Sequence, residues 1–91
     1  MDLQDLINDK NTTIVDVRTE GEFISGNIDG SINIPLDEIV YRAEELKQMQ
    51  PLVVCCLSGG RSGQAAAYLQ SLGCKEVYNG GGWQMVDSQK K

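Results

Sequence analysis

One stretch near the middle of the chain limits the fold more than any other. Residues 52–55, LVVC, contain no polar side chain and lead directly into a glycine-rich segment. A short apolar run without alternation is typical of a strand in a parallel sheet, because both faces of such a sheet are covered. Residues 14–17, IVDV, form a second β-branched run, and residues 31–34 and 76–78 are shorter strand candidates. The sequence therefore predicts a small parallel sheet.

Helical patterns lie between these strands. Residues 3–8 and 20–25 predict two short helices, and a third is predicted to start at an Asp37 cap. A fourth helix is predicted from Ser62 and should stop at Gly73. The residues expected to face the core are Ile39, Val40, Ala43 and Leu46 in the third helix, and Ala65, Ala66, Leu69 and Leu72 in the fourth.

This alternation of strands and helices predicts an α/β layer fold with right-handed crossovers. At 91 residues, the chain is expected to form one domain, residues 1–91. Residues 87–91 are expected to be a frayed polar tail.

The composition argues against several partners. The net charge is −5 and the basic residues are scattered, whereas nucleic-acid binding needs clustered Lys and Arg. No run approaches the roughly 18 apolar residues of a membrane span. We therefore expect no nucleic-acid partner, no membrane insertion and a cytoplasmic location.

The cysteine and histidine counts limit the chemistry. The chain has no histidine, so neither a Ser-His-Asp triad nor a Cys-His pair can form. Its three cysteines include two neighbours and no Cys-x2-Cys spacing, which disfavours both a disulfide framework and a zinc site. We expect no metal and no cofactor, and any nucleophile must be activated without imidazole.

The segment CLSGGRS connects the strand at residues 52–55 to the helix that follows. Ligands bind at such strand-to-helix turns in open α/β sheets. Consecutive glycines allow backbone N–H groups to converge on one anion, and the helix N-terminus adds positive potential. Arg61 supplies a cation at the mouth of this loop. Each feature alone has a simple structural explanation, but their combination predicts an anion-binding site in which a cysteine pKa is lowered.

The adjacent cysteines leave two candidates for the nucleophile. Counted from Cys56, the loop has the form Cys-x4-Arg, and counted from Cys55 it has the form Cys-x5-Arg. These are the loop lengths of two different reactions.

The stretch VVCCLSGGRSGQAAAYLQSLGCKEVYNGGGW resembles the active-site loop, following helix and closing glycine segment of the rhodanese homology domain. Upstream, IVDVRTEGEFISGNIDGSINIPLDEI is similar to the opening motifs of the same family. The likeness covers nearly the whole chain. It implies a rhodanese-like three-layer fold, with a parallel sheet of four to five strands and helices on both faces.

The resemblance implies a sulfurtransferase that carries a sulfane sulfur as a cysteine persulfide. By position it makes Cys56 the nucleophile, and the substrate-binding loop is formed by Leu57, Ser58, Gly59, Gly60, Arg61 and Ser62. The implied donor is thiosulfate, a polysulfide or a persulfide. The implied acceptor is a thiol, a cyanide-like molecule or a protein.

The resemblance also assigns structural roles. Asp16 and Arg18 are expected to pair at the edge of the core, and Trp83 to cover that edge. Asn27 stands where the family usually has histidine, which should affect packing and hydrogen bonding more than chemistry. The loop shows no second cationic group, so affinity for the thiosulfate dianion is expected to be modest.

The alternative spacing, Cys55-x5-Arg61, resembles the phosphate-binding loop of cysteine-dependent phosphatases and arsenate reductases. Those phosphatases usually carry a histidine before the cysteine, where Val54 stands here, and Cys55 fits a buried strand position better than the base of a loop. An inactive interaction module is a third alternative. Cys74 is expected to fill space at a turn, and its functional alternative is a thiol that accepts sulfur from Cys56.

Overall fold

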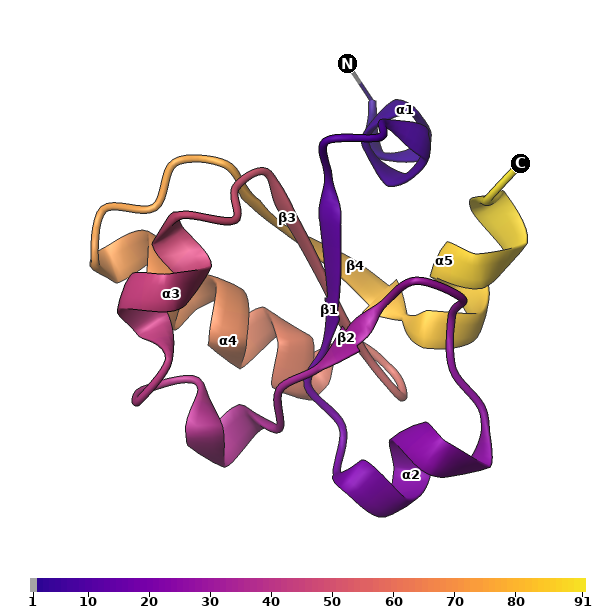
Figure 1. Cartoon of the computed structure of the whole chain (residues 1–91), viewed down its shortest axis with the longest axis horizontal. Coiled ribbons are helices and arrows are strands. Elements are labelled where there is room, and N and C mark those ends of the chain that lie inside the picture. The colour runs from indigo at the N-terminus through magenta and orange to yellow at the C-terminus, as the bar shows by residue number, and fades with distance from the viewer. Residues whose placement is uncertain (1) are drawn as a thin grey trace.

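The computed structural model of the protein describes residues 2–91, which form a four-stranded parallel sheet between two layers of helices (Figure 1). The strand order is β2-β1-β3-β4. In chain order, the elements are α1 (Leu3–Asn8), β1 (Thr13–Asp16), α2 (Glu20–Ser25), β2 (Ile32–Asn33), the 3₁₀ helix η1 (Leu36–Glu38), α3 (Ala43–Lys47), β3 (Leu52–Cys56), α4 (Gly60–Ser71), β4 (Val77–Gly82) and α5 (Trp83–Gln89). None of the helices in residues 2–91 combines the length and the apolar composition that a membrane crossing requires.

The two central strands are β1 and β3, and every residue of β3 is buried. Val54 of β3 is aligned with Val15 of β1 on one side and with Asn79 of β4 on the other. The absence of polar side chains in residues 52–56 follows from this position, because both faces of a central strand are covered.

Successive residues of β3 face two separate hydrophobic cores. Leu52, Val54 and Cys56 belong to the core on the side of α3 and α4, whereas Val53 and Cys55 belong to the core on the side of α1 and α5. Figure 1 shows these two helix pairs on opposite sides of the sheet. Because successive side chains of a strand point to opposite faces of the sheet, the two adjacent cysteines lie on opposite faces.

The predicted fold class is confirmed, since the sheet is parallel and helices cover both faces. The bounds predicted for α1 and α2 are confirmed as well. Helix α4 is followed by Gly73, whose φ of 95° is the left-handed conformation expected just after a helix end.

The single helix predicted from Asp37 through Leu46 is wrong. This segment divides into η1 and α3, and the residue that precedes η1 is Pro35. The amide of Ile39 bonds to the carbonyl of Leu36, a spacing of three residues that turns the chain more tightly than an α-helix does. As a result Val40 is exposed, although the helical pattern predicted it to face the core.

Leu72 is a second error in the predicted core. It caps the C-terminus of α4 and is partly exposed, so the buried stripe of that helix ends at Leu69.

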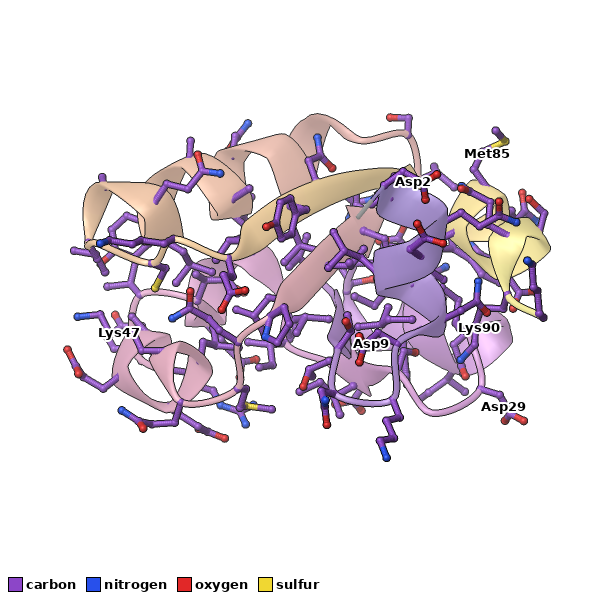
Figure 2. All side chains as sticks on the ribbon, turned by 90° about the horizontal axis from the view of Figure 1, so that it is seen from above. Asp2, Asp9, Asp29, Lys47, Met85 and Lys90 are labelled. Carbon is purple, nitrogen blue, oxygen red and sulfur yellow. The ribbon has the colours of Figure 1, made fainter. Side chains whose placement is uncertain are left out.

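The predicted polar tail is also wrong, because residues 83–89 form α5. Val86 is fully buried in the α1 and α5 core, while Met85 points outward (Figure 2). Lys90, labelled beside Asp29 in Figure 2, donates from Nζ to the Asp29 carbonyl at 3.1 Å. The helix was missed because seven residues with a single fully buried apolar side chain carry almost no periodic signal.

Strand β4 extends through the glycine triplet, beyond the predicted residues 76–78. A Cβ atom at Gly80 would lie 2.8 Å from Val53 Cγ1 and 2.8 Å from Val86 Cγ2. A glycine is therefore required at this position for β3 and α5 to pack against β4.

Gly80→Ala should lower the free energy of unfolding by about 1–3 kcal/mol, because the added methyl overpacks a core that has no space for it. Gly21→Ala is the matched control, since a Cβ at Gly21 in α2 meets nothing within 4 Å. That variant should be neutral or stabilising by up to about 1 kcal/mol. Urea unfolding followed by circular dichroism measures both changes. Equal stability of the two variants would contradict the packing argument.

Candidate active site

The candidate site lies where β1 and β3 end. Residues 57–59 connect the last residue of β3, Cys56, to the first turn of α4. In Figure 1, α2 lies at this same end of the sheet. The carboxyl edge of a parallel sheet is where α/β proteins bind ligands, and the predicted loop occupies that edge.

The loop directs hydrogen-bond donors at the sulfur of Cys56. The backbone amide of Gly59 donates to Cys56 Sγ at 3.0 Å, and the hydroxyl of Ser62 lies 3.4 Å from the same sulfur. Gly59 has a φ of 104°, and an added Cβ would lie 3.3 Å from the Cα of Gly81. Of the two glycines predicted to curl the loop, Gly59 adopts the left-handed conformation and Gly60 begins α4.

This environment lowers the pKa of Cys56 to about 7 without a histidine. Burial acts in the opposite direction and raises the pKa. It is outweighed by hydrogen bonds from the Ser62 hydroxyl and from the backbone amides of Ser62, Gly59 and Ser58. Because these donors stabilise the thiolate, a large fraction of Cys56 is ionised and nucleophilic near neutral pH.

Asn79 of β4 holds the loop in place through hydrogen bonds to Ser62 and Gly59. Its Oδ1 accepts from the Ser62 hydroxyl at 2.7 Å and from the Gly81 amide at 2.9 Å, while its Nδ2 donates to the Gly59 carbonyl at 3.1 Å. This residue was not predicted from the sequence. The only available signal was a polar side chain at the end of a strand whose neighbours end at the same edge.

Cys55 has the opposite environment. Its side chain is fully buried in the other core, and burial followed by the nearby Asp16 carboxylate raises its pKa to about 12. Such a thiol stays protonated at physiological pH and is a poor nucleophile.

Arg61 does not stand free at the mouth of the loop. Its Nη1 and Nη2 donate to the two carboxylate oxygens of Glu22 at 2.7 Å and 3.0 Å. The Arg61 hydrogen bond, followed by one from the backbone of Thr19, lowers the pKa of Glu22 to about 2. The cation expected from the sequence is therefore neutralised by a carboxylate on α2.

Glu22 was not recognised in the sequence. It completes a capping box with Thr19 at the start of α2, in which each residue's side chain is bonded to the other's backbone amide. The spacing Thr-x-x-Glu before a short helix is the signal that could have located it at this end of the sheet.

The other residues singled out from the sequence lie as follows. Leu57 and Ser58 are exposed on the loop. The predicted pair of Asp16 and Arg18 is confirmed at 2.7 Å, and Trp83 packs with its ring centroid 4.6 Å from the Arg18 guanidinium carbon.

Asn27 and Cys74 occupy structural positions. Asn27 donates from Nδ2 to the Phe23 carbonyl at 2.8 Å. Cys74 is buried in the core that also contains Cys56, and its thiol is free. Among residues 2–91, no three His, Cys, Asp or Glu side chains are grouped as metal ligands would be.

Comparison with known proteins establishes the family. The family model described as "Rhodanese-like domain" matches residues 1–87. The chain belongs to the rhodanese-like domain family.

Individual relatives agree with this assignment. An uncharacterised protein of Bacillus subtilis, YqhL, is 41% identical over 72% of this chain. A protein named thiosulfate sulfurtransferase GlpE, from Shewanella oneidensis, is 36% identical over 77% of this chain and 69% of its own length. The crystal structure of a rhodanese-related protein from Thermoplasma volcanium superimposes with a TM-score of 0.76 at 34% identity, covering 88% of this chain and 80% of that one. The match with this chain covers only 52% of the length of the Bacillus protein.

The alkylation rate of the native protein by iodoacetamide should follow the ionisation of Cys56, rising through about pH 7 and levelling off above about pH 8. Ser62→Ala should move the midpoint upward by less than about one unit, because the single hydroxyl proton is shared between Asn79 Oδ1 at 2.7 Å and the sulfur at 3.4 Å, and the backbone amides remain. Ser58→Ala is the control, since it deletes an exposed hydroxyl but keeps the amide that faces the sulfur. Peptide mapping identifies the alkylated residue. Modification of Cys55 at a similar rate would contradict the assignment.

Proposed function

We propose that this protein is a sulfurtransferase that carries sulfane sulfur as a persulfide on Cys56. One observation carries the proposal: the Cys56 sulfur accepts a 3.0 Å hydrogen bond from the Gly59 amide inside a loop at the carboxyl edge of the sheet. The substrate-binding loop would consist of Leu57, Ser58, Gly59, Gly60, Arg61 and Ser62.

The proposed reaction has two steps. The Cys56 thiolate attacks the outer sulfur of a donor. With thiosulfate, the S–S bond breaks, sulfite leaves with the bonding electron pair, and Cys56 carries a persulfide. An acceptor thiolate or cyanide then attacks the outer sulfur of the persulfide and regenerates the Cys56 thiolate. No cofactor or metal takes part in either step.

The loop amides suit this chemistry. They stabilise the thiolate before the first step, and the same donors can stabilise the negative charge on the outer sulfur of the persulfide. The Shewanella relative, whose name includes thiosulfate sulfurtransferase, supports the reaction class. All three cysteines are free thiols, which suits a reducing compartment such as the cytoplasm.

The phosphatase or arsenate reductase alternative requires Cys55 as nucleophile. This cysteine is fully buried, faces the opposite side of the sheet from Cys56, and has a pKa near 12. These properties disfavour an attack by Cys55 on a phosphate ester.

Cys56→Ser should abolish persulfide formation, because serine at this position is not ionised and cannot carry sulfane sulfur. Cys55→Ser should retain most of it. Intact mass after incubation with thiosulfate or polysulfide measures the gain of one sulfur, and dithiothreitol should remove it. Loss of sulfur uptake in Cys55→Ser, with its circular dichroism unchanged, would make the rival assignment correct.

The unmodified protein should hydrolyse p-nitrophenyl phosphate no faster than a buffer blank or the Cys55→Ser variant does. The four-residue spacing between Cys56 and Arg61 forms a shorter loop than the five-residue spacing from Cys55. A shorter loop has less room for a tetrahedral oxyanion, whereas one sulfur atom requires less space. Phosphate release that persists in Cys56→Ser and is lost in Cys55→Ser would contradict this expectation.

A further inference from the structure

The ion pair between Glu22 and Arg61 changes the charge that a sulfur donor meets. Arg61 is the only cationic residue in the loop that runs from Cys56 to Ser62. Both of its terminal nitrogens are engaged by Glu22, at 2.7 Å and 3.0 Å. A bidentate pair of this kind has no net charge, so what remains for a donor is the partial positive charge of the loop amides.

Glu22 is held in place independently of Arg61. Its carboxylate also accepts from the Thr19 amide at 3.1 Å and from the Thr19 hydroxyl at 3.1 Å. A donor would therefore have to displace a carboxylate that is fixed by two further hydrogen bonds before it could use the full charge of Arg61.

A hollow of about 400 Å³ adjoins the loop at Arg61. It is lined by Val17, Thr19, Pro35, Leu36, Asp37 and Arg61. Of the described residues that line it, Arg61 alone is cationic and Asp37 is anionic. The side chains of Val17, Pro35 and Leu36 give it an apolar wall, which suits an organic substituent better than a hydrated oxyanion.

Resting on the sulfurtransferase function proposed above, we propose that Glu22 is a specificity-determining residue that disfavours dianionic donors relative to monoanionic ones. The preferred donors are then monoanionic organic sulfane-sulfur compounds with an apolar substituent in the hollow. Organic thiosulfonates, R–SO₂–S⁻, belong to this class. The Cys56 thiolate attacks their outer sulfur, the S–S bond breaks, and the sulfinate R–SO₂⁻ leaves with the electron pair. Charge and atoms balance as they do for thiosulfate, which releases sulfite.

Three probes separate charge from apolar contact. Thiosulfate is a dianion without an apolar group, methanethiosulfonate is a monoanion with a small one, and benzenethiosulfonate is a monoanion with a large one. The measured quantity is kcat/KM for each donor with cyanide as acceptor. For each protein, the ratio of kcat/KM for one donor to kcat/KM for another is calculated. This ratio is then compared between a variant and the unmodified protein, because the intrinsic reactivity of each donor cancels in the comparison.

The Glu22→Gln variant tests the charge argument. Glutamine keeps the shape of the side chain and an oxygen that can accept from Arg61, but it removes the negative charge. We expect the ratio of kcat/KM for thiosulfate to that for methanethiosulfonate to rise about tenfold, because a dianion gains more than a monoanion from the released cation.

Glu45→Gln is the matched control for Glu22→Gln. Glu45 also forms a bidentate pair with an arginine, accepting from Arg42 at 3.0 Å and 2.8 Å, and the substitution changes the net charge equally. It lies on α3, and its partner Arg42 does not line the hollow, whereas Arg61 does. Its donor ratio should stay within about twofold of the unmodified protein.

The Leu36→Ala variant tests the hollow. It should lower the ratio of kcat/KM for benzenethiosulfonate to that for methanethiosulfonate about fivefold, because part of the apolar wall is lost. Val40→Ala, an exposed residue outside the hollow, should leave this ratio unchanged.

The salt dependence of kcat/KM for thiosulfate, measured on the unmodified protein, tests the same charge argument without a variant. With Arg61 neutralised and a net charge of −5, kcat/KM for thiosulfate should rise or stay level as ionic strength increases. A steep fall would show that a free cation attracts the dianion and would overturn the proposal. An unchanged donor ratio in Glu22→Gln would overturn it too. Absence of sulfur transfer from all three donors would instead overturn the proposed function itself.

Discussion

The buried ion pair between Asp16 and Arg18 links the parts of the structure on which the site depends. Arg18 donates to Asp16 from Nε and Nη2, and to the carbonyls of Glu22 and Gly26 at 3.2 Å and 2.7 Å. The indole of Trp83 covers its guanidinium. One side chain thus connects the end of β1 to α2 and to the start of α5. Removing either charge would leave the other buried without a partner, at a cost of about 3–5 kcal/mol.

The position of Glu22 follows from this arrangement. Because Arg18 binds backbone carbonyls of α2, the helix is fixed against the end of the sheet. The Glu22 side chain is then presented to Arg61 on α4. The same Asp16 carboxylate contributes to raising the pKa of Cys55. Charges outside the loop therefore neutralise Arg61 and raise the pKa of Cys55, whereas the pKa of Cys56 is lowered by donors within the loop.

The sequence predicted the fold class and the loop because their signals are local. An uninterrupted apolar run, a glycine pair and a helical stripe lie within 20 consecutive residues, 52–71, and each has one simple structural explanation. The interruption between η1 and α3 was not predictable, because Ile39, Ala43 and Leu46 have helical spacing whether or not the backbone between them is continuous. The pair of Glu22 and Arg61 joins residues 39 positions apart, and its geometry depends on where α2 packs. Helix α5 depends on Val86 packing against Gly80, a contact that no local pattern indicates.

The opposite orientation of the two neighbouring cysteines also bears on oxidative damage. A disulfide between adjacent residues needs both sulfurs on the same side of the backbone, and here β3 directs them into different cores. If peroxide converts Cys56 to a sulfenic acid, Cys55 cannot condense with it while the strand is intact. The neighbouring thiol therefore offers Cys56 no protection against further oxidation to the sulfinic acid.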